Sequence, residues 1–207
     1  MKKTFVTADL HIGEDRFEIM GRPFQTQQEH VDTLLRNHNS VVSPDDDVIV
    51  VGDVCYQKTP EWLPWIAKFN GNKILIRGNH DRVFTDEQLK PYFSEIIPDG
   101  DGIIRHIEDT ETRDRIVVYI THYPSRGLPN VFTLCGHIHN AWRYQLNTMN
   151  IGVDVNHFYP TDMARIPFYL RAISEYYDED VWNAYHKNNA DYVGLRGKKG
   201  SYYSPTK

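Results

Sequence analysis

The sequence predicts an α/β fold, because short apolar runs typical of buried strands alternate with segments of helical periodicity. Five of these runs are each followed by residues of the kinds that bind metals. The runs at 5–8, 48–51, 74–76, 116–120 and 131–135 precede Asp9-Leu10-His11, Gly52-Asp53, Gly78-Asn79-His80-Asp81, Thr121-His122-Tyr123 and Gly136-His137-Ile138-His139. Open α/β sheets place their sites where the loops after the strands crowd one edge. We therefore expect these polar residues to converge.

The first half of the chain reads as strands separated by capped helices. Residues 5–8 read as a buried first strand, 48–51 are continuously apolar, which predicts a central strand, and 73–77 is the third strand. Thr26-Gln27-Gln28-Glu29 is a capping-box pattern that opens a helix ending near Asn39. Thr59 and Pro60 open a second helix over 60–69, in which Pro64 predicts a kink or a short 3₁₀ start.

The second half is richer in β-like patterns. Thr85-Asp86-Glu87-Gln88 caps a short helix, and two β-like runs within 102–120 predict a hairpin. Residues 131–135 and 148–155 supply two further strands, and 163–173 has helical periodicity. We expect one domain over 1–175 and an extension over 176–207 that is partly loose.

Composition narrows the class of protein. A chain of 207 residues with 40% hydrophobic and 25% charged residues suits a globular domain. Its net charge of −5 argues against a main role in gripping long nucleic acid. Cys55 and Cys135 are too few for a disulfide framework, and we interpret both as packing residues. With no signal-like or membrane-length apolar stretch, a cytoplasmic protein is expected.

The residue types at the strand ends suit a pair of divalent cations. Asp9 and His11 leave one strand together and can bind one ion, while Asp53 follows a glycine that allows a sharp turn. A carboxylate between two ions holds them about 3.5–4 Å apart, as in two-metal hydrolases. Asn79 adds a neutral oxygen, and imidazoles complete the ligands. This mixture favours manganese, with iron, zinc, cobalt or nickel as alternatives.

The five blocks, in this order, resemble those of the calcineurin-like metallophosphoesterases. The resemblance covers about 3–166 and implies two packed mixed β-sheets flanked by helices, a four-layer sandwich. It also implies two metal sites that share Asp53. The first is formed by Asp9, His11 and His139, and the second by Asn79, His122 and His137.

The same resemblance implies roles for residues beside the metals. His80 would protonate the leaving oxygen or stabilise developing charge, and Asp81 would orient His80 by accepting its other ring proton. Gly21-Arg22-Pro23-Phe24 and His122-Tyr123-Pro124 with Arg126 are similar to a small bacterial and phage subgroup of the family. Arg22 and Arg126 are therefore candidate phosphate-binding residues. Asp154 is either an acceptor for a metal-binding side chain or a strand-end cap.

The predicted function is hydrolysis of a phosphoester by a metal-bound hydroxide at a dinuclear centre. A small, nucleotide-type phosphodiester is favoured, because His80 can supply a proton to an alkoxide leaving group. The alternatives are a phosphomonoesterase, a nuclease, and a non-catalytic interaction module with the same fold. The expected partner is a small phosphoester, and neither a membrane nor long nucleic acid is expected. The sequence leaves the oligomeric state open.

Overall fold

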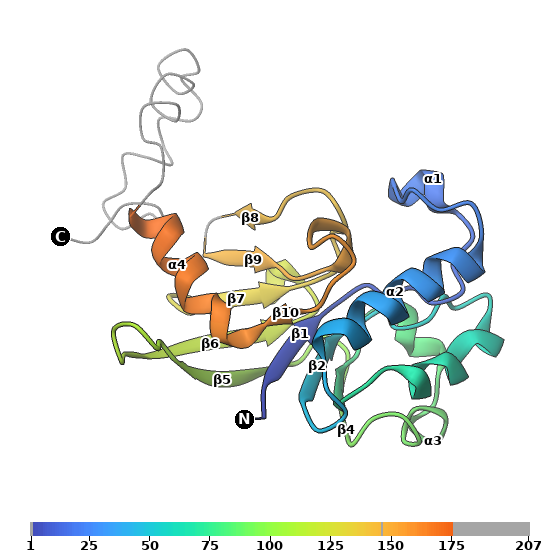
Figure 1. Ribbon diagram of the computed structural model, residues 1–207, viewed down its shortest axis with the longest axis horizontal. Coiled ribbons are helices and arrows are strands. Elements are labelled where there is room, and N and C mark those ends of the chain that lie inside the picture. The colour runs from blue at the N-terminus through green and yellow to red at the C-terminus, as the bar shows by residue number, and fades with distance from the viewer. Residues whose placement is uncertain (1, 146, 176–207) are drawn as a thin grey trace, which may run out of the picture.

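Two five-stranded β-sheets pack against each other in the computed structural model, which describes residues 2–145 and 147–175 (Figure 1). The first sheet has the order β10-β1-β2-β3-β4, with β10 antiparallel to β1 and the other neighbours parallel. The second has the order β5-β6-β7-β9-β8, with antiparallel pairs at both edges. Both sheets are mixed and helices flank them, so the predicted fold class is confirmed.

The elements follow the sequence patterns closely. The strands are β1 (Thr4–Thr7), β2 (Asp47–Val51), β3 (Asn72–Ile76), β4 (Glu95–Ile97), β5 (Gly102–Glu108), β6 (Arg115–Thr121), β7 (Phe132–Cys135), β8 (Tyr144–Gln145), β9 (Thr148–Asn150) and β10 (Thr161–Asp162). The α-helices are α1 (Phe17–Met20), α2 (Gln27–Val41), α3 (Asp86–Leu89) and α4 (Ile166–Glu175). The 3₁₀ helices are η1 (Pro60–Lys68), η2 (His80–Val83), η3 (Pro124–Arg126), η4 (Val153–Val155) and η5 (Met163–Arg165).

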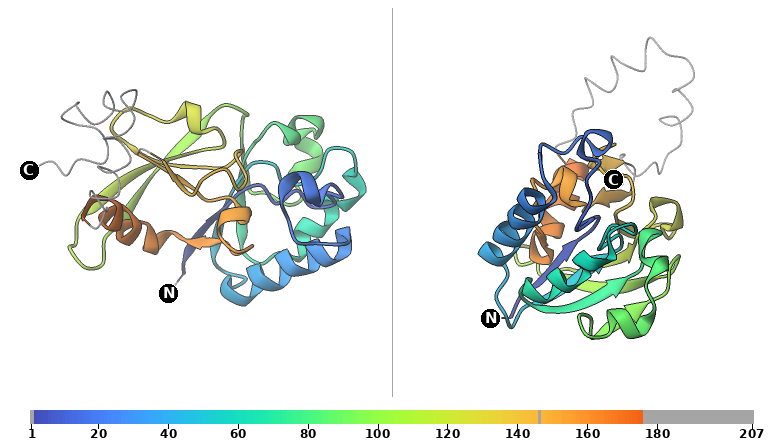
Figure 2. Two further views of the ribbon diagram at one scale, coloured as in Figure 1. Left: turned by 90° about the horizontal axis from the view of Figure 1, so that it is seen from above. Right: turned by 90° about the vertical axis from the view of Figure 1, so that its right-hand side faces the viewer.

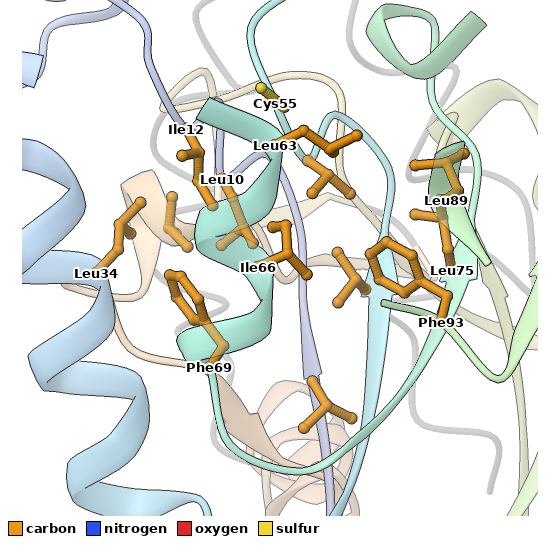
Figure 3. Close-up of a cluster of buried hydrophobic side chains, with 14 of the residues drawn as sticks. Leu10, Ile12, Leu34, Cys55, Leu63, Ile66, Phe69, Leu75, Leu89 and Phe93 are labelled. Carbon is orange, nitrogen blue, oxygen red and sulfur yellow. The ribbon is translucent and has the colours of Figure 1, made fainter. Parts of the chain in front are cut away.

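The first sheet is buried on both faces, which explains its continuous apolar runs. On one face its side chains pack with α2 and η1, and Figure 3 shows Leu34 of α2 and Ile66 of η1 in one cluster with Leu75 of β3. On the other face Ile49 and Val51 belong to a cluster with apolar residues of β6, β7 and α4. The helices α2 and η1 and the second sheet therefore cover opposite faces of the first sheet (Figure 2).

Helix starts match the predicted caps, with one difference in detail. The Thr26 hydroxyl accepts a hydrogen bond from the Glu29 backbone N–H at 3.1 Å, but the Glu29 carboxylate accepts from Gln25 rather than from Thr26. Only half of that capping box therefore forms. Both halves form at Thr85 and Gln88, which open α3. The helix predicted over 60–69 is 3₁₀ along its whole length, with Pro64 inside it.

Two predicted elements end or begin differently. The strand predicted over 148–155 stops at Asn150, because Asn150 Oδ1 accepts from the Gly152 backbone N–H and Val153 then donates to Ala8 of the first sheet. The chain leaves the second sheet there and forms η4. The predicted helix over 163–173 starts as η5 and becomes α4 only at Ile166. The predicted extension over 176–207 lies outside the described residues.

Candidate metal centre

The seven predicted metal-binding residues lie in the loops after β1, β2, β3, β6 and β7. Six of their side chains form two groups, and within each group the candidate ligand atoms lie within 4.8 Å of one another. One group is Asp9, His11 and His139, and the other is Asp53, His122 and His137. The structure thus brings together the two sets that the family resemblance implied. His80 forms a third such group with His11 and Asp53.

Asp53 lies between the two sets. Its Oδ2 atom is 3.5 Å from Nε2 of His11 and 3.5 Å from Nε2 of His122. Ligand atoms about 2.0–2.2 Å from a shared ion lie about 3–3.5 Å apart, so these separations leave room for an ion on either side of the carboxylate. The other oxygen, Oδ1, accepts a hydrogen bond of 2.8 Å from the backbone N–H of His80.

Asn79 belongs spatially to the second set. Its Oδ1 atom lies 3.0 Å from Nδ1 of His137 and 3.3 Å from Nε2 of His122. The amide oxygen therefore faces the same point as both imidazoles, which suits a neutral third ligand.

The ligand loops have an unusual backbone conformation. The φ angle is positive at Asp9 (57°), His11 (47°), Asp53 (54°), His137 (75°) and His139 (49°). Residues other than glycine rarely adopt this region, and such strain concentrates at functional sites because the surrounding structure enforces it. Here the strained backbone turns successive side chains of each loop toward one point.

Hydrogen bonds between loops hold these turns. Asp9 donates its backbone N–H to the Gly52 carbonyl at 3.1 Å, and His11 donates to the Asp53 carbonyl at 2.9 Å. Gly52 has a φ of +79°, and a Cβ there would lie 2.3 Å from Nδ1 of His122. The glycine before Asp53 therefore allows a ring of the second sheet to approach the first sheet. Across the same interface the His137 backbone N–H donates to both Asp9 carboxylate oxygens.

Buried polar side chains that lack hydrogen-bond partners or carry raised carboxyl pKa values indicate that these residues fit cations. Neither ring nitrogen of His11 has a hydrogen-bond partner, although the residue is 1% exposed. Burial lowers the pKa of His11 to about 4, which keeps a neutral imidazole available as a ligand. Burial also raises the pKa of Asp9 to about 6, against the pull of nearby imidazoles. Orphaned buried polar atoms cost free energy, and coordination of a cation would remove that cost.

Two of the candidate ligand histidines are oriented by a hydrogen-bond acceptor that faces their Nδ1 atom. His122 Nδ1 lies 2.9 Å from the Val51 carbonyl oxygen, which leaves Nε2 facing Asp53. Burial opposes protonation of His122, but the nearby carboxylates of Asp53 and Asp9 raise its pKa to about 9. His139 Nδ1 lies 3.1 Å from Asp154 Oδ2. Acceptors of this kind hold metal-binding histidines in one tautomer and orientation.

Asp154 therefore acts as an acceptor for His139, the first of the two roles that the sequence left open. It lies in η4 and receives two hydrogen bonds from Arg22, from Nε to Oδ1 at 2.7 Å and from Nη2 to Oδ2 at 2.9 Å. Although burial opposes ionisation, the bonds from His139 and Arg22 hold the pKa of Asp154 well below its usual range. The carboxylate is charged and is fixed against the ring.

The structure contradicts the prediction that Arg22 binds substrate phosphate. Its side chain is 0% exposed. All three guanidinium nitrogens have partners, namely Asp154, His30 and the carbonyl oxygens of Asp9 and Leu10. Arg22 instead holds the first ligand loop and Asp154 in place. A motif position does not reveal burial, so the sequence could not separate these roles.

The role predicted for Asp81 is also different in the structure. Its carboxylate accepts hydrogen bonds from the backbone N–H groups of Asp53 (2.8 Å), Val54 (3.0 Å) and Gly78 (2.9 Å), not from the His80 ring. Burial and the charge of Asp53 raise the pKa of Asp81 to about 6. Asp81 therefore fixes the backbone of the central ligand loop, and Nδ1 of His80 is buried without a partner.

Comparison with known proteins identifies the family. The profile of the calcineurin-like phosphoesterases matches residues 2–197. The chain belongs to the calcineurin-like phosphoesterase family. This membership and the ligand groups support a metal-dependent hydrolase of phosphoesters.

Individual relatives match smaller regions of the chain. The Gene 66 protein of Mycobacterium phage L5 is 39% identical over 84 residues, and the uncharacterized protein MJ1445 of Methanocaldococcus jannaschii is 32% identical over 85 residues. These regions span 39% and 40% of this chain, and 41% and 48% of the two relatives. The crystal structure of AQ665, a protein of unknown function from Aquifex aeolicus, shares the fold, with a TM-score of 0.59, 24% identity and coverage of 81% of this chain and 98% of that one.

Three further candidate residues, His80, Arg126 and Arg77, differ in their exposure. His80 is half-buried, and since Nδ1 is buried and unpartnered, Nε2 is the nitrogen that a substrate can reach. Arg126 lies exposed in η3, with no side-chain hydrogen bond to a described residue. Arg77 pairs with Asp86 at 2.6 Å, as expected of a strand-end arginine.

None of the helices within 2–145 and 147–175 has the length and apolarity to span a bilayer.

Sequence reasoning missed three residues around the centre. Arg16 and Arg82 lie on ligand loops with exposed guanidinium groups, and buried Asn150 donates from Nδ2 to the carbonyl oxygens of His139 and Trp142. Arg82 directly follows the Gly-Asn-His-Asp block, which was the available signal. Arg16 and Asn150 carry no pattern that marks them in a single sequence.

Proposed function

We propose that this protein is a dinuclear metal-dependent phosphodiesterase that favours small, nucleotide-type diesters. The observation that carries the proposal is the position of Asp53 Oδ2, 3.5 Å from an imidazole nitrogen of each ligand set. One carboxylate oxygen between two sets of ligands is the arrangement that two adjacent cations require.

Under this proposal Asp9, His11 and His139 hold one ion, and Asn79, His122 and His137 hold the other, with Asp53 shared. When bound, two such cations neutralise phosphate oxygens and acidify a water molecule for in-line attack. The four most buried ligands, each at most 1% exposed, are Asp9, His11, Asp53 and His122. They close one side of the centre to solvent, so the phosphate approaches from the side of His80, His137 and His139.

His80 is the proton donor in this account. Its ring lies edge-on to His11, with ring centroids 4.7 Å apart, and its backbone N–H is bonded to Asp53. Nε2 faces the side from which substrate arrives, and it donates its proton to the leaving oxygen. That donation matters most for an alkoxide leaving group, which is why diesters are favoured.

Turnover of two model substrates tests this function. Protein reconstituted with manganese is expected to hydrolyse bis(p-nitrophenyl) phosphate, with a higher kcat/KM than for p-nitrophenyl phosphate. Asp53→Asn, which keeps the size of the side chain but removes its charge, is expected to lose most bound manganese and all measurable turnover. A higher kcat/KM for the monoester would mean that the protein is a phosphomonoesterase rather than a phosphodiesterase. Wild-type turnover in Asp53→Asn would refute the dinuclear mechanism.

A further inference from the structure

Two arginines beside the metal centre, Arg16 and Arg82, share an arrangement that the proposed mechanism does not use. In each, Nε donates a hydrogen bond to a carboxylate. Nη2 donates to the same carboxylate in Arg16 and to a tyrosine hydroxyl in Arg82. Nη1 has no hydrogen-bond partner among the described residues in either case. Each arginine also contacts a tyrosine that lies next to residues of the centre.

Arg16 lies on the loop that follows His11. Its Nε and Nη2 donate to the two carboxylate oxygens of Glu14 at 2.9 and 3.1 Å, and Glu14 is fully buried. The guanidinium carbon is 4.7 Å from the ring centre of Tyr56, and the Tyr56 ring lies 6.4 Å from that of His80. One aromatic ring thus separates Arg16 from the predicted proton donor.

Arg82 lies near the second candidate metal site, the one that contains His122 and His137. Its Nε donates to Asp99, and its Nη2 donates to the Tyr123 hydroxyl at 3.1 Å. The Tyr123 ring is 4.8 Å from the ring of His122 and 4.8 Å from the ring of His137. One aromatic ring therefore separates Arg82 from two histidines of the second candidate metal site.

Exposure distinguishes these two arginines from Arg22. The side chains of Arg16 and Arg82 are 44% and 63% exposed, whereas that of Arg22 is 0% exposed. Neutralising a carboxylate explains both bonds of Arg16 to Glu14 and the bond from Arg82 Nε to Asp99, but not the bond from Arg82 Nη2 to Tyr123. It does not explain why both guanidinium groups contact a tyrosine beside the centre while Nη1 has no partner among the described residues. A guanidinium restrained in this way loses little entropy on binding a phosphate.

We propose that Arg16 and Arg82 bind phosphate groups of the substrate other than the one that is cleaved. This inference rests on the proposed function, in which the metal ligands receive the scissile phosphate. Each arginine lies one ring beyond that position, at a place suited to the next phosphate along a chain. The substrate class is therefore a nucleotide with at least two phosphates, either adjacent, as in a nucleoside polyphosphate, or separated by a sugar, as in an oligonucleotide.

Calorimetry on manganese-loaded protein tests the inference without relying on turnover. The ligands are thymidine 5′-monophosphate, thymidine 5′-diphosphate and thymidine 3′,5′-bisphosphate. The variants are Arg82→Ala and the double variant Glu14→Gln, Arg16→Ala, which removes one guanidinium without leaving buried Glu14 charged and unpaired. Arg36→Ala, on the exposed face of α2, is the matched arginine control.

The wild type is expected to bind at least one two-phosphate ligand about 10-fold or more tightly than the monophosphate, since a hydrogen bond between a guanidinium and a phosphate is charge-assisted and among the stronger ones. Loss of that gain in one or both test variants, but not in Arg36→Ala, supports the proposal. The preferred ligand shows whether the phosphates are adjacent or separated by the sugar. Equal affinity for all three ligands, or a gain that survives in both test variants, overturns it. Failure of the proposed function is read separately, from turnover of bis(p-nitrophenyl) phosphate.

Discussion

Individual residues of the centre divide by exposure. Asp9, His11, Asp53 and His122 are buried, whereas His80 is half-buried and His137 is exposed. Burial disfavours charge, so the carboxylates among the buried residues need a compensating cation. The exposed side chains are free to meet a substrate. We therefore expect substitution of a buried residue to lower the metal content, and substitution of His80 to lower kcat while the metal stays bound.

His80→Ala tests that separation. The variant is expected to keep its bound metal and to lose about 10²–10⁴-fold in kcat, because a positioned proton donor contributes about that much. The loss should be larger for diesters with poor leaving groups. Metal content and kcat are measured together, with the exposed hairpin residue His106 changed to alanine as a control. If His80→Ala loses metal as well, His80 is a ligand and not a proton donor.

Asp154→Asn tests the orientation of His139. The carboxylate lies 3.1 Å from His139 Nδ1, and removing its charge is expected to weaken metal affinity by about 10–100-fold. Excess manganese should restore turnover, since no residue that touches substrate has changed. The readouts are the affinity for manganese and turnover across a manganese titration. Unchanged affinity would show that Asp154 serves only as the partner of Arg22.

At the scale of elements, the loops after the strands carry both the ligands and the strain. Backbone hydrogen bonds connect neighbouring loops, as from His11 to Asp53 or from Gly136 to His122. The positive φ angles are maintained by these contacts. Small residues are required where loops cross, and Gly52 and Gly78 are equally crowded, since a Cβ at either position would lie 2.3 Å from a side-chain atom of another ligand loop.

Two glycine substitutions separate crowding from backbone strain. Gly52 and Gly100 have similar positive φ angles, +79° and +86°, but a Cβ at Gly100 meets nothing within 4 Å. Gly100→Ala is expected to cost about 1–2 kcal/mol from the left-handed backbone alone. Gly52→Ala should cost about 1–3 kcal/mol more from overpacking and should also weaken metal binding, because it displaces His122. Urea unfolding and manganese affinity measure both effects, and equal costs at the two sites would contradict the account.

The sequence predicted those elements whose pattern is long enough to detect. Mainly apolar runs of three to five residues, each followed by a block of polar residues, marked five of the strands, whereas β4, β8 and β10 have two or three residues and were not predicted. The ligand blocks were found because their residue types suit only a few chemistries. Arg22 and Asp81 were misassigned because burial and hydrogen-bond partners depend on distant segments, such as Asp154 for Arg22 and Val54 for Asp81. No single-sequence pattern encodes such contacts.

At the scale of the whole molecule, the centre lies where the two sheets meet. His122 and His137 come from the second sheet, and each contacts the first sheet, through the Val51 carbonyl oxygen and the Asp9 carboxylate respectively. Ions bound by both sets would connect the sheets directly. Binding that requires the folded state also stabilises it.

Acid sensitivity of the metal-free protein is a property of the whole fold. Burial and the charge of Arg22 lower the pKa of His30 to about 2 from a usual value of 6.5. Below pH about 6.5 the unfolded chain binds a proton that the folded chain excludes, so stability falls as pH falls, by up to about 1.4 kcal/mol per pH unit.

His30→Gln keeps an acceptor for Arg22 and removes this titration. With chelator present, urea midpoints at pH 7.5 and 5.0 are expected to differ less in the variant than in the wild type. The titrating metal ligands are common to both proteins and cancel in the comparison. Identical losses in the two proteins would mean that His30 is protonated in the folded state.

Anomalous scattering from crystals grown with manganese tests the central claim most directly. Two peaks about 3.5–4 Å apart are expected, one on each side of the Asp53 carboxylate, with Asp9, His11 and His139 around one and Asn79, His122 and His137 around the other. A single peak, or none in excess manganese, would contradict the dinuclear account.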